Sequence, residues 1–221
     1  MVAKSKKGTL TKQNIINAAK QLFYENGFVK TTLAEIARES GANKAMVSYY
    51  FGNKNNLALE VYNEYMVAMK VKTQNIIASQ FPDSDLLLRT AIEYRLQNRN
   101  CNRNKGLNRF YHELCDSNIF MKTESASVGF IENINKTHKL GLSRVDVKAL
   151  ALANLSVVHG LHVARNEGFL DCSSEYLAET EIRLLLQSLK IDNELIENYI
   201  ERSREIVDKI EISVGKNFKV L

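Results

Sequence analysis

The scarcity of residues that break helices constrains this fold more than any other feature of the sequence. The chain has 221 residues but only one proline, Pro82, and ten glycines. Apolar residues recur mostly at three- and four-residue spacing, which is the period of one face of a helix. We therefore expect an all-α protein whose helices end at the few glycines and at Pro82. A chain of this length buries a sizeable core, as one large domain or two small ones.

Capping residues divide the chain into separate helices. Thr32 with Glu35, and Ser143 with Asp146, have the spacing of a capping box, and Asn43 and Asn53 are good N-caps. Gly27, Gly41, Gly141 and Gly168 are candidate stops. The pattern predicts helices over residues 12–26, 32–40, 43–51, 54–79, 84–99, 104–116, 119–139, 143–166, 174–190 and 193–213.

Positive charge is concentrated at the start of the chain. Residues 1–54 hold nine basic and three acidic side chains, a net charge of +6, and the remaining 167 residues hold 21 basic and 22 acidic ones, a net charge of −1. This distribution is expected when one small module meets a polyanion and the rest of the chain does not. Lys4, Lys6 and Lys7 could form an arm along DNA or a solubilising tail.

Residues 35–51 have the pattern of a helix-turn-helix. Two short helices meet at a tight turn, with the small residue Ala37 and Gly41 allowing a steep crossing. If Val47 and Phe51 pack inward, the helical period places a second set of residues outward and Met46 at the boundary. That outward set is Lys44, Ala45, Ser48 and Tyr49. Such a face fits a DNA major groove, while its flanks meet phosphates.

The segments "AAKQLFYENGF", "TTLAEIARESG" and "YYFGNKNNL" within residues 11–62 carry a family resemblance. This stretch resembles the DNA-binding domain of the tetracycline-repressor (TetR) family of bacterial transcription regulators. The resemblance implies a helix-turn-helix domain over residues 1–52, with a recognition helix at about 43–51. It also implies a helical effector-binding and dimerisation domain over residues 53–221.

Carried onto this sequence, the resemblance implies a set of DNA contacts. Thr32 would meet a phosphate at the start of its helix, and Asn43 would open the recognition helix. Groove-facing residues would be Lys44, Ala45, Met46 and Tyr49, and backbone contacts would come from Ser48, Tyr50 and Lys54. Position 48 is often tyrosine in the family and position 46 is usually small or polar, so the operator sequence cannot be transferred from relatives.

The region from residue 143 to 168 is apolar nearly all round, with Gly160 in its middle. A helix with that pattern must be covered on all sides, so we expect a dimer in which it packs in a four-helix arrangement with one of the last two helices. The alternative is a core helix within one chain. A second apolar seam, suited to a partner helix, runs along the last long helix through Ile196, Ile200, Ser203, Val207 and Ile210.

Aromatic and sulfur-bearing side chains near the middle of the chain are candidates for an effector pocket. They are Phe110, Tyr111, His112, Cys115, Phe120, Met121 and Phe130. Their helical spacing is more typical of a core. Three cysteines without a CxxC pair favour reduced thiols, and His159 with His162 lacks a matching acid, so we expect neither a metal site nor a cofactor.

Taken together, the sequence predicts a cytoplasmic, DNA-binding transcriptional regulator without a membrane partner. It would bind a palindromic operator as a homodimer through its C-terminal helices, and respond as a repressor to an unknown small molecule. A helical enzyme or scaffold with an incidental basic N-terminus is the alternative, although no GxSxG, Walker, GxGxxG or HExxH pattern occurs.

Overall fold

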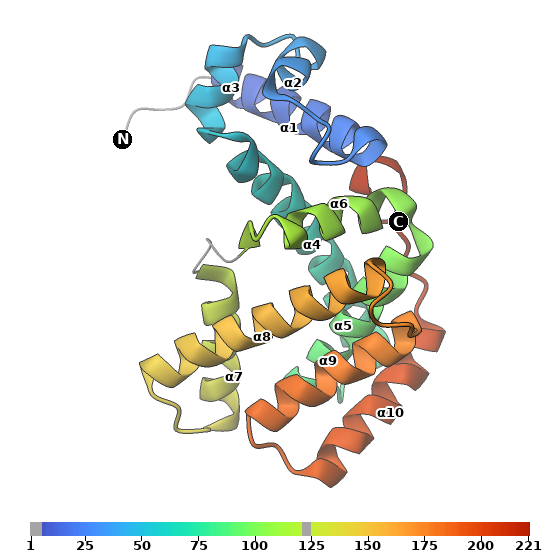
Figure 1. The fold of residues 1–221 in the computed structure, drawn as a ribbon. Helices are drawn as coiled ribbons and strands as arrows, with labels where there is room; N and C mark the ends of the chain where they lie inside the picture. Colours follow the sequence, from blue (N-terminus) through green and yellow to red (C-terminus); the bar gives the residue numbers. More distant parts are fainter. Residues whose placement is uncertain (1–5, 121–124) are drawn as a thin grey trace.

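The computed structural model describes residues 6–120 and 125–221, and the regular elements of this part of the chain are helices (Figure 1). Its α-helices are α1 (Lys6–Asn26), α2 (Leu33–Glu39), α3 (Lys44–Phe51), α4 (Lys54–Gln80), α5 (Leu86–Arg103), α6 (Lys105–Asp116), α7 (Ser125–His138), α8 (Arg144–Asn166), α9 (Ser174–Ser188) and α10 (Asn193–Lys209). A short 3₁₀ turn, η2 (Lys216–Phe218), lies near the C-terminus. The all-α prediction is confirmed.

Helices α1 to α3 form a small head at one end of the molecule, and α4 runs from this head into a larger body (Figure 1). The predicted N-caps of α2, α3, α4 and α8 all accept the expected backbone N–H bond. The start of α1 was predicted wrongly, since the helix begins at Lys6 instead of residue 12. Thr11 lies inside it, because no residue nearby forces the chain to break. Lys4 and Met121 lie outside the described residues, as do the side chains of Lys6 and Lys7.

The body is organised around α5, which packs against α10, α9, α6 and α4, while α8 packs against α7, α6 and α9. Arg95 of α5 lies in the middle of this core with only 1% of its surface exposed. Its guanidinium pairs with Glu175 and Glu179 and donates to Ser203 and to the Ile200 carbonyl. Burying an arginine is tolerable only when its donors are satisfied, so this network ties α9 and α10 to α5.

The C-terminal segment differs from the prediction. Helix α10 ends at Lys209 instead of residue 213, and the chain then turns back to the end of α1. Phe218 is buried there, with its ring centroid 5.4 Å from that of Tyr24 and 4.8 Å from that of Phe110. Lys216 pairs with Glu25 at 2.8 Å. The last residues therefore fasten the head to the body.

Candidate nucleic-acid interface

The turn between α2 and α3 is fixed by backbone geometry and by a small buried interface. Gly41 has φ +68°, in the left-handed region that glycine adopts without strain. The Ala42 N–H donates to the Ala37 carbonyl across the turn at 3.0 Å. Ile36 and Val47 are fully buried. These contacts hold α3 in one orientation relative to the rest of the head.

The outer face of α3 has the composition that the helical period predicts. Asn43 caps the helix through a 2.8 Å bond from the Met46 N–H. Lys44, Ala45 and Ser48 are exposed and Met46 is half-buried. Tyr49 is 83% exposed, and the half-buried Tyr50 ring lies edge-on to it at 5.2 Å. A ring exposed in this way can pack on a partner while its hydroxyl forms a hydrogen bond.

Thr32 begins α2 within a complete capping box. Its hydroxyl accepts from the Glu35 N–H at 3.2 Å, and its own N–H and hydroxyl each donate to the Glu35 carboxylate at 2.8 Å. The bonds from the Thr32 side chain and backbone lower the pKa of Glu35. A phosphate at this position would meet that carboxylate, so the predicted contact would require the Glu35 side chain to turn away.

Lys54 lies in a place that the sequence did not indicate. Its ammonium donates to the carbonyls of Phe28, Val29 and Thr31 at 2.9, 3.3 and 3.0 Å and lies 4.3 Å from the Phe28 ring centroid. Burial lowers the pKa of Lys54, and the nearby Glu113 and Glu35 oppose that shift. The three donors of the ammonium are engaged within the chain. Lys54 joins α4 to the loop after α1 and is not held ready for a phosphate.

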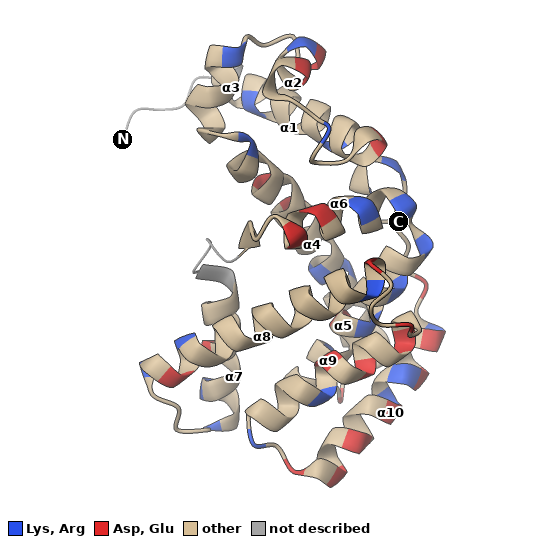
Figure 2. Cartoon of the chain, in the orientation of Figure 1, with Lys and Arg blue, Asp and Glu red and all other residues tan. Residues whose placement is uncertain are grey.

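Acidic residues beyond position 54 offset part of the positive charge of the head. Lys12 pairs with Glu60 and Lys20 pairs with Glu64, each at 2.6 Å, so both lysines bind α1 to α4. Three exposed basic residues of the head have no ion pair within residues 6–120 and 125–221: Lys30, Arg38 and Lys44. Figure 2 shows that the basic residues of α2 and α3 lie at isolated positions.

The residues proposed for an effector pocket mostly form core. Phe110, Tyr111, Cys115 and Phe120 are buried, and the Tyr111 ring lies 4.5 Å from His162 and 6.2 Å from His159. Burial lowers the pKa of His159 to about 4 and is the main cause that lowers that of His162 to about 3. Among the described residues no group of three or more His, Cys, Asp or Glu side chains is placed to hold a metal ion.

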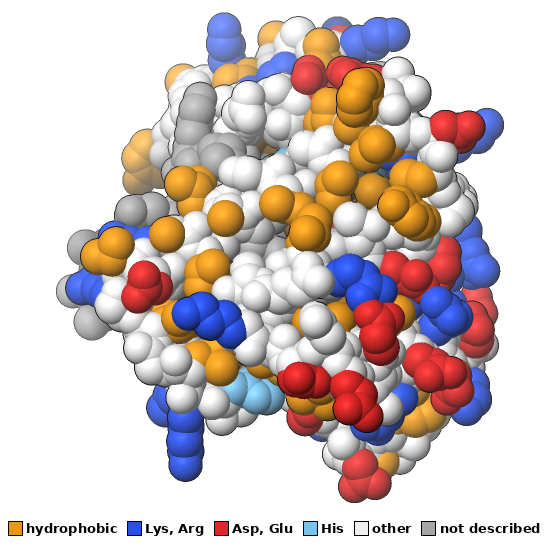
Figure 3. Space-filling model, turned by 60° about the horizontal axis from the view of Figure 1, so that its bottom comes forward, with side chains coloured by type: hydrophobic (Ala, Val, Ile, Leu, Met, Phe, Trp, Pro, Cys, Tyr) orange, Lys and Arg blue, Asp and Glu red, His pale blue; other side chains and the backbone are white. Residues whose placement is uncertain are grey.

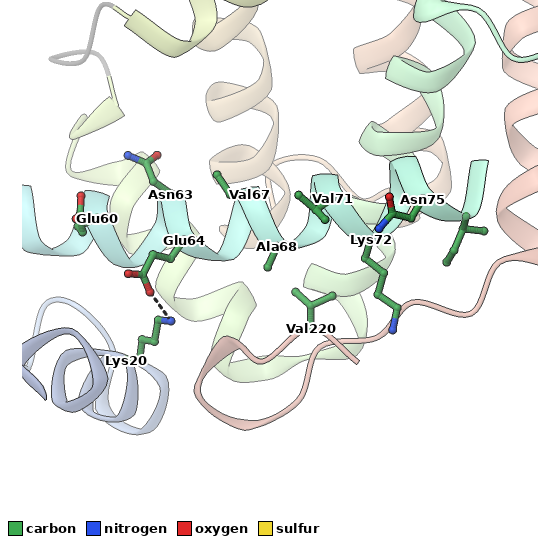
Figure 4. A pocket seen from close by; sticks show the side chains of 11 residues that line it. Lys20, Glu60, Asn63, Glu64, Val67, Ala68, Val71, Lys72, Asn75 and Val220 are labelled. Atoms are coloured by element: carbon green, nitrogen blue, oxygen red, sulfur yellow. Dashed lines mark ion pairs between the residues drawn. The ribbon is translucent and has the colours of Figure 1, made fainter. Parts of the chain in front are cut away.

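Phe130 differs from the other four, because it lines a cavity of about 570 Å³ between α4, α5 and α7. Most of its polar lining could not be predicted from the sequence, since these residues come from three helices far apart in the chain. A second hollow, of about 810 Å³, is an open groove along α4. Figure 4 shows its lining, with Val67, Ala68 and Val71 on α4 and with Lys20 and Val220 below that helix.

Helix α8 leaves much of its apolar surface uncovered. Val147 and Ala151 face the core, but Val145, Leu152 and the following Phe169 are exposed, the last by 85%. No heavy atom lies within 4 Å of the position that a side chain at Gly160 would take. Figure 2 shows α8 with hardly any charge along its middle, and Figure 3 shows hydrophobic side chains gathered across this face.

Within the described residues, α8 is the one helix long and apolar enough to cross a membrane, judged by length and composition alone. Only 22% of its most apolar window is buried in the structure. Helices that pack against other protein surfaces pass the same test, so no membrane contact follows from it.

Residues of the head are similar to known DNA-binding proteins. The family model described as bacterial regulatory proteins, tetR family, matches residues 15–61, which span most of α1, all of α2 and α3 and the start of α4. The HTH-type transcriptional regulator QacR of Staphylococcus aureus is 33% identical over 94 residues, covering 39% of this chain and 50% of that protein. Residues 15–61 therefore carry the DNA-binding segment of the tetR family model. These relatives are named as transcriptional regulators, which is not an enzymatic role.

The likeness to solved structures covers most of the chain, whereas the match to QacR covers 39% of it. The chain spans half the length of QacR. The structure of RolR with resorcinol has a TM-score of 0.64 at 13% identity and covers 90% of this chain and 96% of that one. Thermus thermophilus FadR with lauroyl-CoA has a TM-score of 0.59 at 18% identity, covering 80% of this chain and 94% of that one. At these identities the likeness concerns the fold alone.

Proposed function

We propose that this protein is a sequence-specific DNA-binding transcriptional regulator of the TetR family, which acts as a ligand-responsive repressor in the cytoplasm. The observation that carries the proposal is the outer face of α3. Lys44, Ala45, Ser48 and Tyr49 project from a capped helix whose inner face is locked by Val47 and Phe51. A helix of this kind enters a major groove, where its side chains meet base edges and thymine methyl groups.

Two copies of the head are needed to read a palindrome, because successive major grooves on one side of DNA lie about 34–36 Å apart. We propose that the homodimer forms through the uncovered faces of α8 and α9. Leu152 of α8 and Leu184 of α9 are among the exposed large apolar side chains of these helices. The earlier seam on α10 is already used within the chain, since Ile196 and Ser203 are fully buried. A monomeric mass in analytical ultracentrifugation at micromolar concentration contradicts this arrangement.

We also propose that the head, residues 1–52, and the body, residues 53–221, act as two domains joined by α4. A small molecule bound in the body would change the relative tilt of the two heads, and the change in operator affinity would equal its differential affinity for the two states. RolR and FadR carry small molecules in solved structures of the same fold. That likeness supports an effector-binding body here without identifying the effector.

The test is binding to a duplex from the protein's own upstream region, compared with a random duplex of equal length by fluorescence anisotropy over a range of salt concentrations. We expect the upstream duplex to bind about 10³-fold or more tightly at physiological salt. Equal affinity for the two duplexes at every salt concentration contradicts the regulator proposal.

Substitutions on α3 test whether its outer face makes the contacts with the upstream duplex. Tyr49→Ala should weaken upstream-duplex binding by about 1–3 kcal/mol, the usual worth of a base contact, while circular dichroism and dimer mass stay unchanged. Lys44→Gln should weaken binding to both duplexes. Lys72→Gln is the matched control, because Lys72 lies in the groove of Figure 4, away from α3.

A further inference from the structure

The cavity between α4, α5 and α7 has the size and the lining of a small-molecule site. Its volume of about 570 Å³ lies within the range of about 300–1,000 Å³ that ligand pockets occupy. Gln74 and Lys70 come from α4, Arg89 and Glu93 from α5, and Phe130 from α7. A ligand in this space would therefore touch the helix that joins the body to the head.

One hydrogen-bonded chain fixes the polar side of the cavity. Arg89 donates from Nε to the Ser84 carbonyl at 2.8 Å and from Nη1 to Gln74 Oε1 at 3.0 Å. The Gln74 Nε2 donates in turn to Glu93 Oε1 at 2.6 Å. Arg89 is thus held rigidly, yet its Nη2 has no partner in the described part of the chain. The buried Ser84 hydroxyl also lacks a hydrogen-bond partner among those residues.

The charge of the cavity favours an anion. Arg89 and Lys70 bring two positive charges, and Lys70 is exposed and has no ion pair within residues 6–120 and 125–221. Glu93 is the single acidic residue of the lining. Burial is the main cause that raises the pKa of Glu93, and Lys70, Gln74 and Arg89 oppose it. The lining therefore holds one more basic than acidic side chain, and its one carboxylate already accepts from Gln74.

The rest of the lining is mixed, since α7 contributes Asn133 and Thr137 beside the apolar ring of Phe130. Phe130 and Leu86 are half-buried. No heavy atom lies within 4 Å of the position that a Cβ at Gly129 would occupy, so space remains beside the helix next to Phe130. A flat or apolar group would lie against Phe130 while an acidic group reached Arg89.

We propose that this cavity binds a small organic anion with an aromatic or apolar body, whose acidic group pairs with Arg89 and Lys70 and whose body packs on Phe130. The inference rests on the proposed function, because it identifies the chemical class of the effector. A planar guanidinium with a free edge matches a carboxylate, and an exposed ammonium at the mouth of the cavity attracts one from solution.

The probes are three compounds of nearly equal shape: 2-naphthoate, 2-naphthamide and 2-naphthamidine. Each is titrated by isothermal calorimetry into the full-length protein without DNA. We expect saturable binding of naphthoate and at least tenfold weaker binding of the amide and the amidine. Equal binding of acid and amide, preference for the amidine, or no binding of naphthoate up to millimolar concentration overturns the proposal.

Two variants test the location. Lys70→Gln changes an exposed side chain, so it should fold normally and weaken naphthoate binding about threefold to tenfold. Lys72→Gln lies two residues along α4, in the groove of Figure 4, and should leave naphthoate affinity unchanged. Arg89→Gln should abolish the preference for acid over amide. Equal effects of the two lysine variants contradict the site.

Because these titrations contain no DNA, they fail or succeed separately from the regulator proposal. Naphthoate binding that depends on Lys70, without any preference for the upstream duplex, would retain the anion site and reject the regulator. Specific DNA binding without naphthoate binding would retain the regulator and reject this class of effector.

Discussion

Glu181 of α9 should make the protein less stable as the pH rises, and replacing it with glutamine should remove that effect. The side chain is 3% exposed and accepts one bond, from Asn98 Nδ2 at 2.7 Å. Burial raises the pKa of Glu181 from 4.5 to about 8, although the Asn98 bond acts in the opposite direction. At neutral pH the folded chain therefore holds a protonated carboxyl that the unfolded chain has ionised.

The size of the effect follows from proton linkage. A group whose folded pKa lies above its unfolded pKa contributes stability that is fully present below the unfolded value and lost as the pH rises through the folded value. Between pH 4.5 and 8 the unfolded state binds fewer protons, so the free energy of unfolding should fall by about 1.4 kcal/mol per pH unit from this group. At pH 7 the accumulated cost is about 3 kcal/mol.

Glu181→Gln keeps the shape of the protonated carboxyl and the acceptor for Asn98 but does not ionise. We expect its free energy of unfolding to exceed that of the unsubstituted protein by about 3 kcal/mol at pH 7 and by about 1 kcal/mol or less at pH 5. The assay is urea unfolding followed by circular dichroism at fixed protein concentration, at intervals from pH 5 to 8. Glu205→Gln, at an exposed position of α10, is the control.

The difference between the two pH profiles isolates Glu181, because every other titrating group is present in both proteins. His159 and His162, whose pKa values are lowered by burial, reduce stability below pH 6.5 to the same extent in each. Parallel profiles from pH 5 to 8, or a variant that is less stable at pH 7, would refute the reasoning.

Three further predictions concern the head, the core and the C-terminal segment. Phe218→Ala should lower the free energy of unfolding by about 3–5 kcal/mol in urea denaturation, as for other buried phenylalanines. Leu221→Ala, at a half-exposed position, should lower it by under about 1 kcal/mol. Equal losses in the two variants contradict the fastening role of Phe218. Gly41→Ala should lower the free energy of unfolding by about 1 kcal/mol through backbone strain alone, because no heavy atom lies within 4 Å of the new methyl group. An unchanged midpoint of urea unfolding contradicts this. In His162→Gln the free energy of unfolding should fall less steeply as the pH drops from 6.5 to 4, because the imidazole whose pKa is lowered to about 3 is gone. An unchanged pH dependence over this range argues against a buried neutral histidine.

The parts of the fold that the sequence predicted are those governed by neighbours along the chain. Thr32, Asn43, Asn53 and Ser143 cap their helices because each needs only a backbone N–H two or three residues away. The outward face of α3 was predicted from the helical period with Val47 and Phe51 packed inward. Such arguments reached the head, where helices are short and the turn is tight.

The parts that the sequence did not predict depend on segments that meet only in space. Lys54 looked like a free cation, but the loop after α1 brings three carbonyls to its ammonium. Residues 214–221 carry no helical period, so nothing indicated that Phe218 would return to α1. Gln74 and Arg89 are unremarkable on their own helices, and their place in the cavity appears only when α4 and α5 pack together.

The head is attached to the body through α4 on one side, and through α6 and the C-terminal segment at the end of α1, and this limits how a ligand could act. Ion pairs from Lys12 and Lys20 bind α1 to α4 along its first half. Arg109 of α6 donates to the carbonyls of Tyr24 and Glu25 at 2.8 and 2.7 Å, which holds the other end of α1. In the proposed regulator, an anion between α4, α5 and α7 would displace α4, whereas α6 would keep the end of α1 in place. Because one attachment moves and the other does not, the head would pivot about the end of α1 instead of sliding, and a pivot is the motion that alters the spacing of two recognition helices.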